Sequence, residues 1–197
     1  MRFGTTLVDE ILTALDRQLG LARAGRHELV VCGGSALAAL GLVTRTTRDV
    51  DVLGTAEVSA AGLRVLRLRE LPAEVRAAAA RVARDFGLDE DWLNLGPAAQ
   101  LDLGLPEGFG GRLVRRGYGE HLTVYFAGRY DQIHFKLDAA ADQDDYHVQD
   151  LAALGPADEE LLAAARWALT QDVSAEFRRS LGDFLTHEGH DHVARSL

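Results

Sequence analysis

The 197-residue chain has one cysteine and no long apolar run. A single cysteine cannot form an intramolecular disulfide. Cys32 lies in the apolar stretch "LVVCGG", so we expect it to be a small buried side chain rather than a reactive thiol. No apolar segment reaches the roughly 20 residues that a membrane span needs. The N-terminal residues carry acids and lack a continuous apolar core, so we predict no signal peptide and expect a cytoplasmic protein.

Positive charge is also scarce. The chain has 21 lysines and arginines but 30 aspartates and glutamates, which gives a net charge of −9. Such a surface does not favour non-specific binding to duplex DNA. Arginines at 64–84 and at 112–116 form either solvated faces or a local patch for RNA phosphates or a triphosphate. The glycines fit neither a Walker loop nor a dinucleotide fingerprint, which disfavours kinase and dehydrogenase functions.

Periodicity and end signals predict a mixed α+β fold: a small mixed sheet flanked by helices, with a helical C-terminal third. We expect one domain over residues 1–197, with a core at about 25–140 and a helical part at about 145–190. Pro72, Ser174 and Asp131 are read as helix starts, and Gly87 as a helix end. Strands are predicted at 27–33, 48–54 and 121–128, and helices at 5–25, 34–41, 72–87, 130–143, 147–155, 156–172 and 174–189.

Two aspartates alternate with valines in "RDVDVLG". Residues i and i+2 of a strand point to the same face, so Asp49 and Asp51 would present their carboxylates together while Val50 and Val52 enter the core. Neighbouring carboxylates repel each other, and burial increases the cost. A divalent cation relieves this repulsion, and Mg²⁺ is commonly bound by one or two carboxylates together with substrate phosphates.

A glycine pair precedes these aspartates at the end of an apolar run. Gly33 and Gly34 would let the backbone approach a phosphate, and a strand-to-helix turn directs backbone N–H groups toward an anion. The Ser35 hydroxyl either donates to a phosphate oxygen or caps the helix. Arg45 and Thr47 lie just upstream of the acidic pair and are candidate phosphate contacts.

Together, these residues resemble the signature of the nucleotidyltransferase superfamily related to DNA polymerase beta. The stretch "GGSALAALGLVTRTTRDVDVL" is especially similar to minimal nucleotidyltransferase-like bacterial proteins grouped with AbiEii and MenA-type toxins, in an uncharacterised bacterial branch. Their pattern is Gly-Gly-x-Ala-Leu followed by Arg-x-Thr-x-Asp-x-Asp. "DWLNLGP", "FKLDAAADQDDYHVQDL" and "EELLAAARWAL" extend the similarity. The toxins' later lysine and aspartate correspond to Lys136 and Asp150.

The resemblance implies an enzyme that transfers a nucleoside monophosphate from a nucleoside triphosphate to a hydroxyl. Asp49 and Asp51 would hold Mg²⁺ or Mn²⁺, and Lys136 and Asp150 would complete the catalytic set. The acceptor would be an RNA, with tRNA as one candidate, or a protein, and an antitoxin protein is an implied partner.

Several alternatives stay open. The superfamily often carries a third carboxylate, for which Asp102 and Asp131 are the candidates here, although each also fits a turn or cap. A catalytically silent nucleotidyltransferase fold acting as a binding module is the main rival function. A nucleotide hydrolase that uses the same site without an acceptor is a further one.

Overall fold

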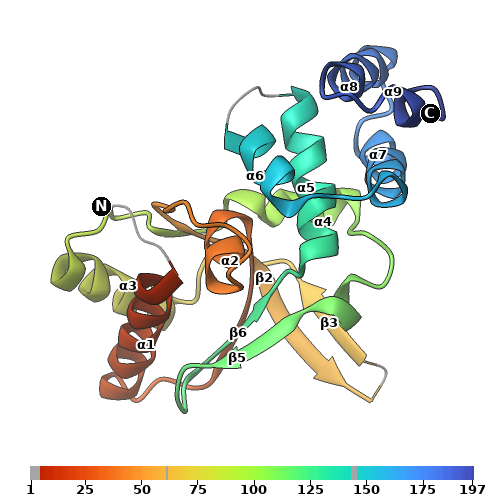
Figure 1. The fold of residues 1–197 in the computed structure, drawn as a ribbon. Helices are drawn as coiled ribbons and strands as arrows, with labels where there is room; N and C mark the ends of the chain where they lie inside the picture. Colours follow the sequence, from red (N-terminus) through yellow and green to blue (C-terminus); the bar gives the residue numbers. More distant parts are fainter. Residues whose placement is uncertain (1–4, 61, 143–145) are drawn as a thin grey trace. The chain divides into compact units, whose positions relative to one another are not determined.

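The computed structural model describes residues 5–60, 62–142 and 146–197. The chain divides into two compact units, Met1–Gly128 and Arg129–Leu197. The first unit contains the sheet and the second is helical (Figure 1). Among the described residues, no helix has the length and apolar character needed to cross a membrane.

The first unit is built on a mixed sheet of six strands in the order β3-β2-β1-β6-β5, with β4 pairing with β2. The central strand β1 runs antiparallel to β2 and parallel to β6. The predicted mixed sheet is therefore confirmed. The strands are β1 His27–Cys32, β2 Val50–Ser59, β3 Gly62–Leu66, β4 Leu93–Asn94, β5 Val114–Gly117 and β6 Leu122–Phe126.

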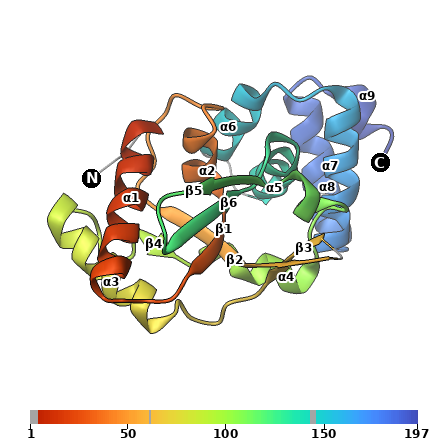
Figure 2. The ribbon, with the colours of Figure 1, turned by 90° about the horizontal axis from the view of Figure 1, so that it is seen from below.

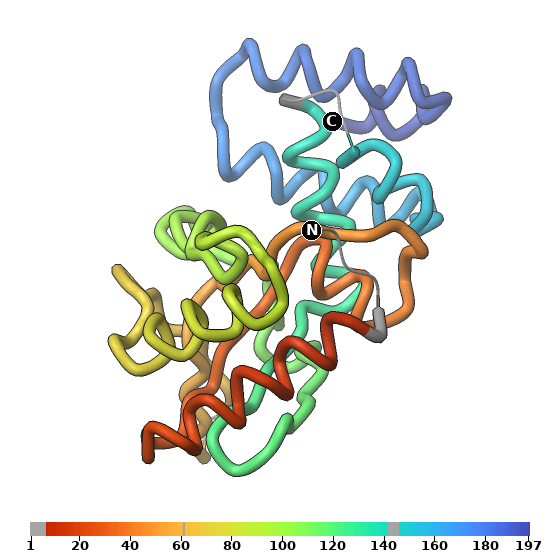
Figure 3. The backbone as a smooth tube through the Cα atoms, turned by 90° about the vertical axis from the view of Figure 1, so that its left-hand side faces the viewer, coloured from red at the N-terminus to blue at the C-terminus, as the bar shows by residue number. Residues whose placement is uncertain are grey.

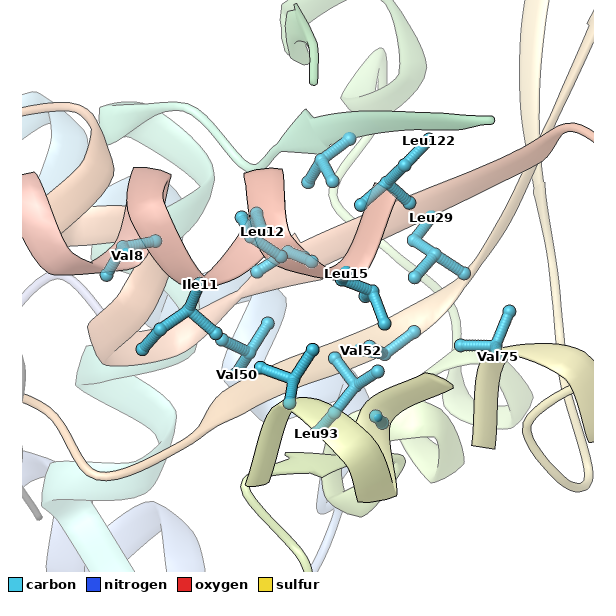
Figure 4. Close-up of a cluster of buried hydrophobic side chains, with 14 of the residues drawn as sticks. Val8, Ile11, Leu12, Leu15, Leu29, Val50, Val52, Val75, Leu93 and Leu122 are labelled. Carbon is cyan, nitrogen blue, oxygen red and sulfur yellow. The ribbon is translucent and has the colours of Figure 1, made fainter. Parts of the chain in front are cut away.

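One face of this sheet carries the core of the first unit. Alternate residues of β1, β2 and β6 are buried on it, as the period of two requires. Helices α1, Thr5–Leu21, and α3, Ala73–Phe86, pack against each other and contribute to the same core (Figures 2 and 4). Helix α3 starts after Pro72 and ends at Gly87 in the left-handed conformation, as predicted. The remaining elements here are α2 Gly33–Ala39, η1 Gly96–Ala99, α4 Gln100–Leu103 and η2 Phe109–Arg112.

A polar network ties α1 to strand β5 and the residue that follows it. Arg116 forms an ion pair with Asp9 at 2.8 Å and also donates to the carbonyl oxygen of Ala39. The Tyr118 hydroxyl donates to Asp9 at 2.7 Å. Burial raises the pKa of Tyr118, and its hydrogen bond to the Asp9 carboxylate raises it further. The phenol therefore stays protonated and acts as a permanent donor.

In the part of the second unit that the structure describes, residues 129–142 and 146–197, the helices are α5 Arg129–Asp142, α6 Tyr146–Leu154, α7 Asp158–Gln171, α8 Ala175–His187 and α9 Asp191–Ala194 (Figure 3). Ser174 caps α8 by accepting a hydrogen bond from the Phe177 N–H, as its position predicts. Arg129 joins the start of α5 to the α6–α7 connection, donating to the Leu154 carbonyl oxygen and pairing with Glu160 at 2.6 Å. The hydrogen bond that the Glu160 carboxylate accepts from Arg129 is the main reason why the pKa of Glu160 is lowered.

The structure corrects two boundaries that matter for the site. Helix α5 begins at Arg129, so Asp131 lies inside its first turn and is not its N-cap. Strand β2 begins at Val50, so Asp49 directly precedes the strand. The sequence patterns also missed the short elements β4, β5, α4 and α9, which have two to four residues each. Elements of this length span too few residues to show a period.

Asp16 provides a stability test of this packing. Its carboxylate accepts hydrogen bonds from the N–H groups of His121, at 2.9 Å, and Leu122, at 2.8 Å. We expect Asp16→Ala to lower the free energy of unfolding by about 1–3 kcal/mol, because two buried donors lose their acceptor. Glu10→Ala, which removes an exposed carboxylate from the same helix, should change it by less than about 0.5 kcal/mol. Urea titrations of both variants make the comparison, and equal midpoints would contradict it.

Candidate metal and phosphate site

The two aspartates lie at the start of β2. Val50 and Val52 on either side of Asp51 are fully buried in the core, so the Asp51 side chain belongs to the opposite face of the sheet. Asp49 lies two residues before it, and both aspartates are half-buried. The predicted division into valines inside and carboxylates outside is what the structure contains. The position of Asp49 differs from the prediction, because Asp49 lies in the loop that precedes the strand.

The glycine turn packs directly onto the second aspartate. Cys32, the last residue of β1, pairs with Asp51 in the antiparallel register, so the turn after β1 falls beside that carboxylate. Gly33 has a φ of +68°, in the left-handed region that glycine favours. A Cβ atom at this position would collide with Asp51 Oδ2. The residue must therefore be glycine both for its conformation and for its contact.

The second glycine is similarly confined by the loop that carries the first aspartate. A Cβ atom on Gly34 would lie 2.9 Å from Thr47 Oγ1 and 3.1 Å from the guanidinium of Arg45. The structure therefore brings Gly33, Gly34, Arg45, Thr47, Asp49 and Asp51 together in the first unit, although they are spread over 19 positions of sequence.

Neutral donors hold both carboxylates. The buried Thr47 hydroxyl donates to Asp49 Oδ1 at 3.1 Å. Asn94 Nδ2 donates to Asp51 Oδ1 at 3.3 Å, and Asn94 Oδ1 accepts from the Gly96 N–H at 2.7 Å. These hydrogen bonds come from uncharged groups and fix the orientation of the two carboxylate side chains.

Ser35 is fully buried, and its hydroxyl donates to the Cys32 carbonyl oxygen at 3.4 Å. The first N–H groups of a helix have no acceptor within that helix. The backbone of the turn is thus the part of this segment with donors available to an anion, while Ser35 supports the turn from inside.

The two candidates for a third carboxylate lie on helices of different units. Asp102, on α4, forms an exposed ion pair with Arg67. Asp131 is fully buried in the first turn of α5, in the second unit. Within residues 5–60, 62–142 and 146–197, no three acidic, histidine or cysteine side chains form a cluster that could hold a metal ion.

A cleft of about 330 Å³ is lined by residues that directly follow Asn94, starting at Leu95. Two arginines, two leucines and three small residues of η1 line it. These residues are Arg67, Leu68, Arg69, Leu95, Gly96, Ala98 and Ala99. Asn94 donates to the Asp51 carboxylate and accepts from the Gly96 N–H. These two hydrogen bonds connect Asp51 to the wall of this cleft. Part of the arginine-rich segment at 64–84 therefore lines a concave surface that includes Gly96, the residue that anchors Asn94.

Lys136 and Asp150 meet in the second unit. Lys136 on α5 and Asp150 on α6 form an ion pair at 2.9 Å, with exposed side-chain fractions of only 4% and 1%. The Lys136 ammonium also lies 5.3 Å from the centre of the Tyr146 ring and 3.4 Å from His147 Nδ1. The resemblance that singled out this lysine and this aspartate therefore selected two residues in direct contact.

Asn94 is the site residue that the sequence patterns did not predict. It is the chain's single asparagine, and it stands in a two-residue strand within a segment read as loop. The available signal was the "DWLN" alternation, in which the buried Trp92 and Leu93 precede a polar residue. A strand this short resembles a turn in sequence, because its pairing with β2 is visible only in three dimensions.

Comparison with known proteins identifies the family of the chain. A family model described as "Nucleotidyltransferase of unknown function (DUF6036)" matches residues 10–181. The match covers well over half of the chain, so the chain belongs to this nucleotidyltransferase family. No curated protein and no solved structure matches it.

Replacing Gly33 tests the contact on which the site depends, and Gly41 provides a matched control. Both glycines have a φ of +68°, but a Cβ atom on Gly41 would meet nothing within 4 Å. Gly41→Ala should therefore cost only the left-handed strain of about 1–2 kcal/mol. Gly33→Ala should cost a further 1–3 kcal/mol or so, because the methyl group displaces the Asp51 carboxylate. Equal losses in denaturant titrations would mean that the turn does not pack against Asp51.

Proposed function

We propose that this member of the nucleotidyltransferase family is an active, metal-dependent enzyme that transfers a nucleoside monophosphate from a triphosphate to a hydroxyl group. One observation carries the proposal: the glycine turn is packed onto the Asp51 carboxylate. A turn with available N–H groups and a pair of carboxylates are thereby adjacent. Phosphate oxygens bind to the N–H groups, and a divalent cation binds to the carboxylates.

The residues fit Mg²⁺ or Mn²⁺. Hard divalent cations prefer carboxylate oxygens and accept only one or two from the protein when phosphates and water supply the rest. Asp49 and Asp51 offer that number, held by neutral hydrogen bonds from Thr47 and Asn94. When bound, the cation would supply positive charge to the phosphate oxygens and to the attacking hydroxyl.

The residues of the chain would mainly position the reactants. The N–H groups of Gly33 and Gly34 hold phosphate oxygens, and Arg45, whose guanidinium lies beside Gly34, adds positive charge there. The acceptor hydroxyl oxygen attacks the α-phosphorus and forms the new O–P bond, and its proton passes to solvent water. The bond from the α-phosphorus to the bridging oxygen breaks, and pyrophosphate leaves with that electron pair. Catalysis of this kind depends on alignment and charge stabilisation more than on covalent steps.

For the acceptor we propose an RNA, tRNA included, ahead of a protein hydroxyl. The cleft that includes Gly96 supports this choice, because Arg67 and Arg69 line it in a chain that is otherwise strongly acidic. Cationic side chains in a concave surface attract a phosphodiester backbone. A role as the toxin of a toxin–antitoxin pair, with an antitoxin protein as partner, follows from the resemblance described above and is part of the proposal.

Lys136 and Asp150 are assigned to the same chemistry. A lysine ammonium is a compact charge suited to phosphate oxygens. Here its charge is held by Asp150 in a buried pair that also serves stability. Loss of either partner alone leaves an uncompensated buried charge. The function of the pair can therefore be tested only when both partners are replaced together.

The second candidate function is a catalytically silent binding module. The absence of a three-carboxylate cluster from the described part of the chain favours it. Such a module would bind nucleotide or RNA without transfer, and its binding would not depend on Asp49 and Asp51.

Label transfer tests the main proposal. We would incubate the protein with Mg²⁺, each α-labelled triphosphate, and either total tRNA or cell lysate. Label should appear on the acceptor with the wild type and fall at least about 100-fold with Asp51→Asn, because one carboxylate charge is lost at the metal. Asp183→Asn, which removes an exposed carboxylate on α8 of the second unit, should retain activity. Transfer that survives in Asp51→Asn would contradict the assignment.

The ion pair of the second unit gives a separate prediction. Lys136→Met alone should lower the free energy of unfolding by about 3–5 kcal/mol, because Asp150 stays buried without its partner. The double variant Lys136→Met, Asp150→Leu should recover most of that loss. Our assignment predicts that this folded double variant fails to transfer label. Wild-type transfer by the double variant would show that the pair is structural only.

A further inference from the structure

Asn94 occupies the position directly beside the second aspartate. Strand β4 runs parallel to β2 and pairs Asn94 with Asp51, as well as Leu93 with Val50. Leu93 and Val50 are buried on the core face, which sends the next residue of each strand to the other face. The register, rather than a flexible loop, thus sets the contact between the two side chains.

Both ends of the Asn94 amide are engaged. Its oxygen accepts from the Gly96 N–H at 2.7 Å, which leaves the NH₂ group to donate to Asp51 Oδ1 at 3.3 Å. Gly96 follows two residues later, so its backbone anchors the amide locally. Asp51 is therefore confined on one side by Asn94 and on another by the backbone of Gly33.

An amide is the group that suits this position if the aspartate binds a cation. A carboxylate here would add a like charge next to Asp51, and like charges at this separation disfavour ionisation. A lysine or arginine would satisfy Asp51 but would compete with a divalent ion for it. An aliphatic side chain would remove this donor. The asparagine orients Asp51 and adds no charge of its own.

We propose that Asn94 is a positioning residue of the transfer reaction, which holds the Asp51 carboxylate in the orientation that the divalent cation requires. This inference rests on the proposed function. Groups that orient a metal ligand commonly contribute 10- to 100-fold to metal affinity or activity. Asn94 acts through Asp51, so its removal should affect the metal and the rate of transfer rather than the fold.

The test compares Asn94→Ala with Gln18→Ala. Gln18 makes the same kind of bond, from its amide to the Asp85 carboxylate at 3.4 Å, but on α1. We would measure Mn²⁺ affinity by electron paramagnetic resonance, together with kcat and the acceptor KM for label transfer. Asn94→Ala should weaken Mn²⁺ binding by about 10- to 100-fold and lower kcat, with an unchanged acceptor KM. Gln18→Ala should match the wild type in all three.

Asn94→Asp keeps the inference testable if the alanine variant does not fold. One carboxylate oxygen can still accept from Gly96, while the donor to Asp51 is lost and a like charge is added beside it. At saturating Mn²⁺, kcat should fall at least about 10-fold. Wild-type Mn²⁺ affinity in Asn94→Ala, or wild-type kcat in Asn94→Asp, would overturn the inference. A wild-type protein that neither binds Mn²⁺ nor transfers label would instead overturn the proposed function.

Discussion

The candidate site depends on the contact between the backbone of Gly33 and the carboxylate of Asp51. The antiparallel register of β1 and β2 creates it, because it places the last residue of β1 opposite Asp51. The apolar residues on the other face of these strands fix that register, since a slip by one residue would expose Val50 and Val52. The core thus determines where the turn and the aspartate meet.

Electrostatics then limits what this contact can bind. Thr47 and Asn94 donate hydrogen bonds to Asp49 and Asp51 without adding charge, and the glycine turn lies against Asp51. This arrangement suits a divalent cation that carries phosphates, because each offsets charge that the other brings. The buried pair Lys136–Asp150 follows a different rule, since its two charges already satisfy each other.

The sequence predicted the mixed sheet, the α3 boundaries and the residues around the turn, because these depend on local periods and on glycine chemistry. It placed Asp49 inside the strand, although Asp49 precedes it, because alternation continues by chance past the end of pairing. It missed Asn94, whose role depends on a two-residue strand that pairs with β2 from 43 positions away. It also could not show that Ser35 points its hydroxyl at a carbonyl oxygen, because that depends on the geometry of the turn.

The central claim, that a metal-bound triphosphate occupies the turn beside Asp51, can be tested most directly by paramagnetic broadening. Backbone amide resonances of the ¹⁵N-labelled protein would be recorded while a Mn²⁺ complex of a non-hydrolysable triphosphate is added. The account predicts that the amides of Gly33, Gly34 and Asn94 broaden first, and that Mg²⁺ in excess reverses the effect. Broadening elsewhere in the chain, or none at concentrations that saturate binding, would contradict it.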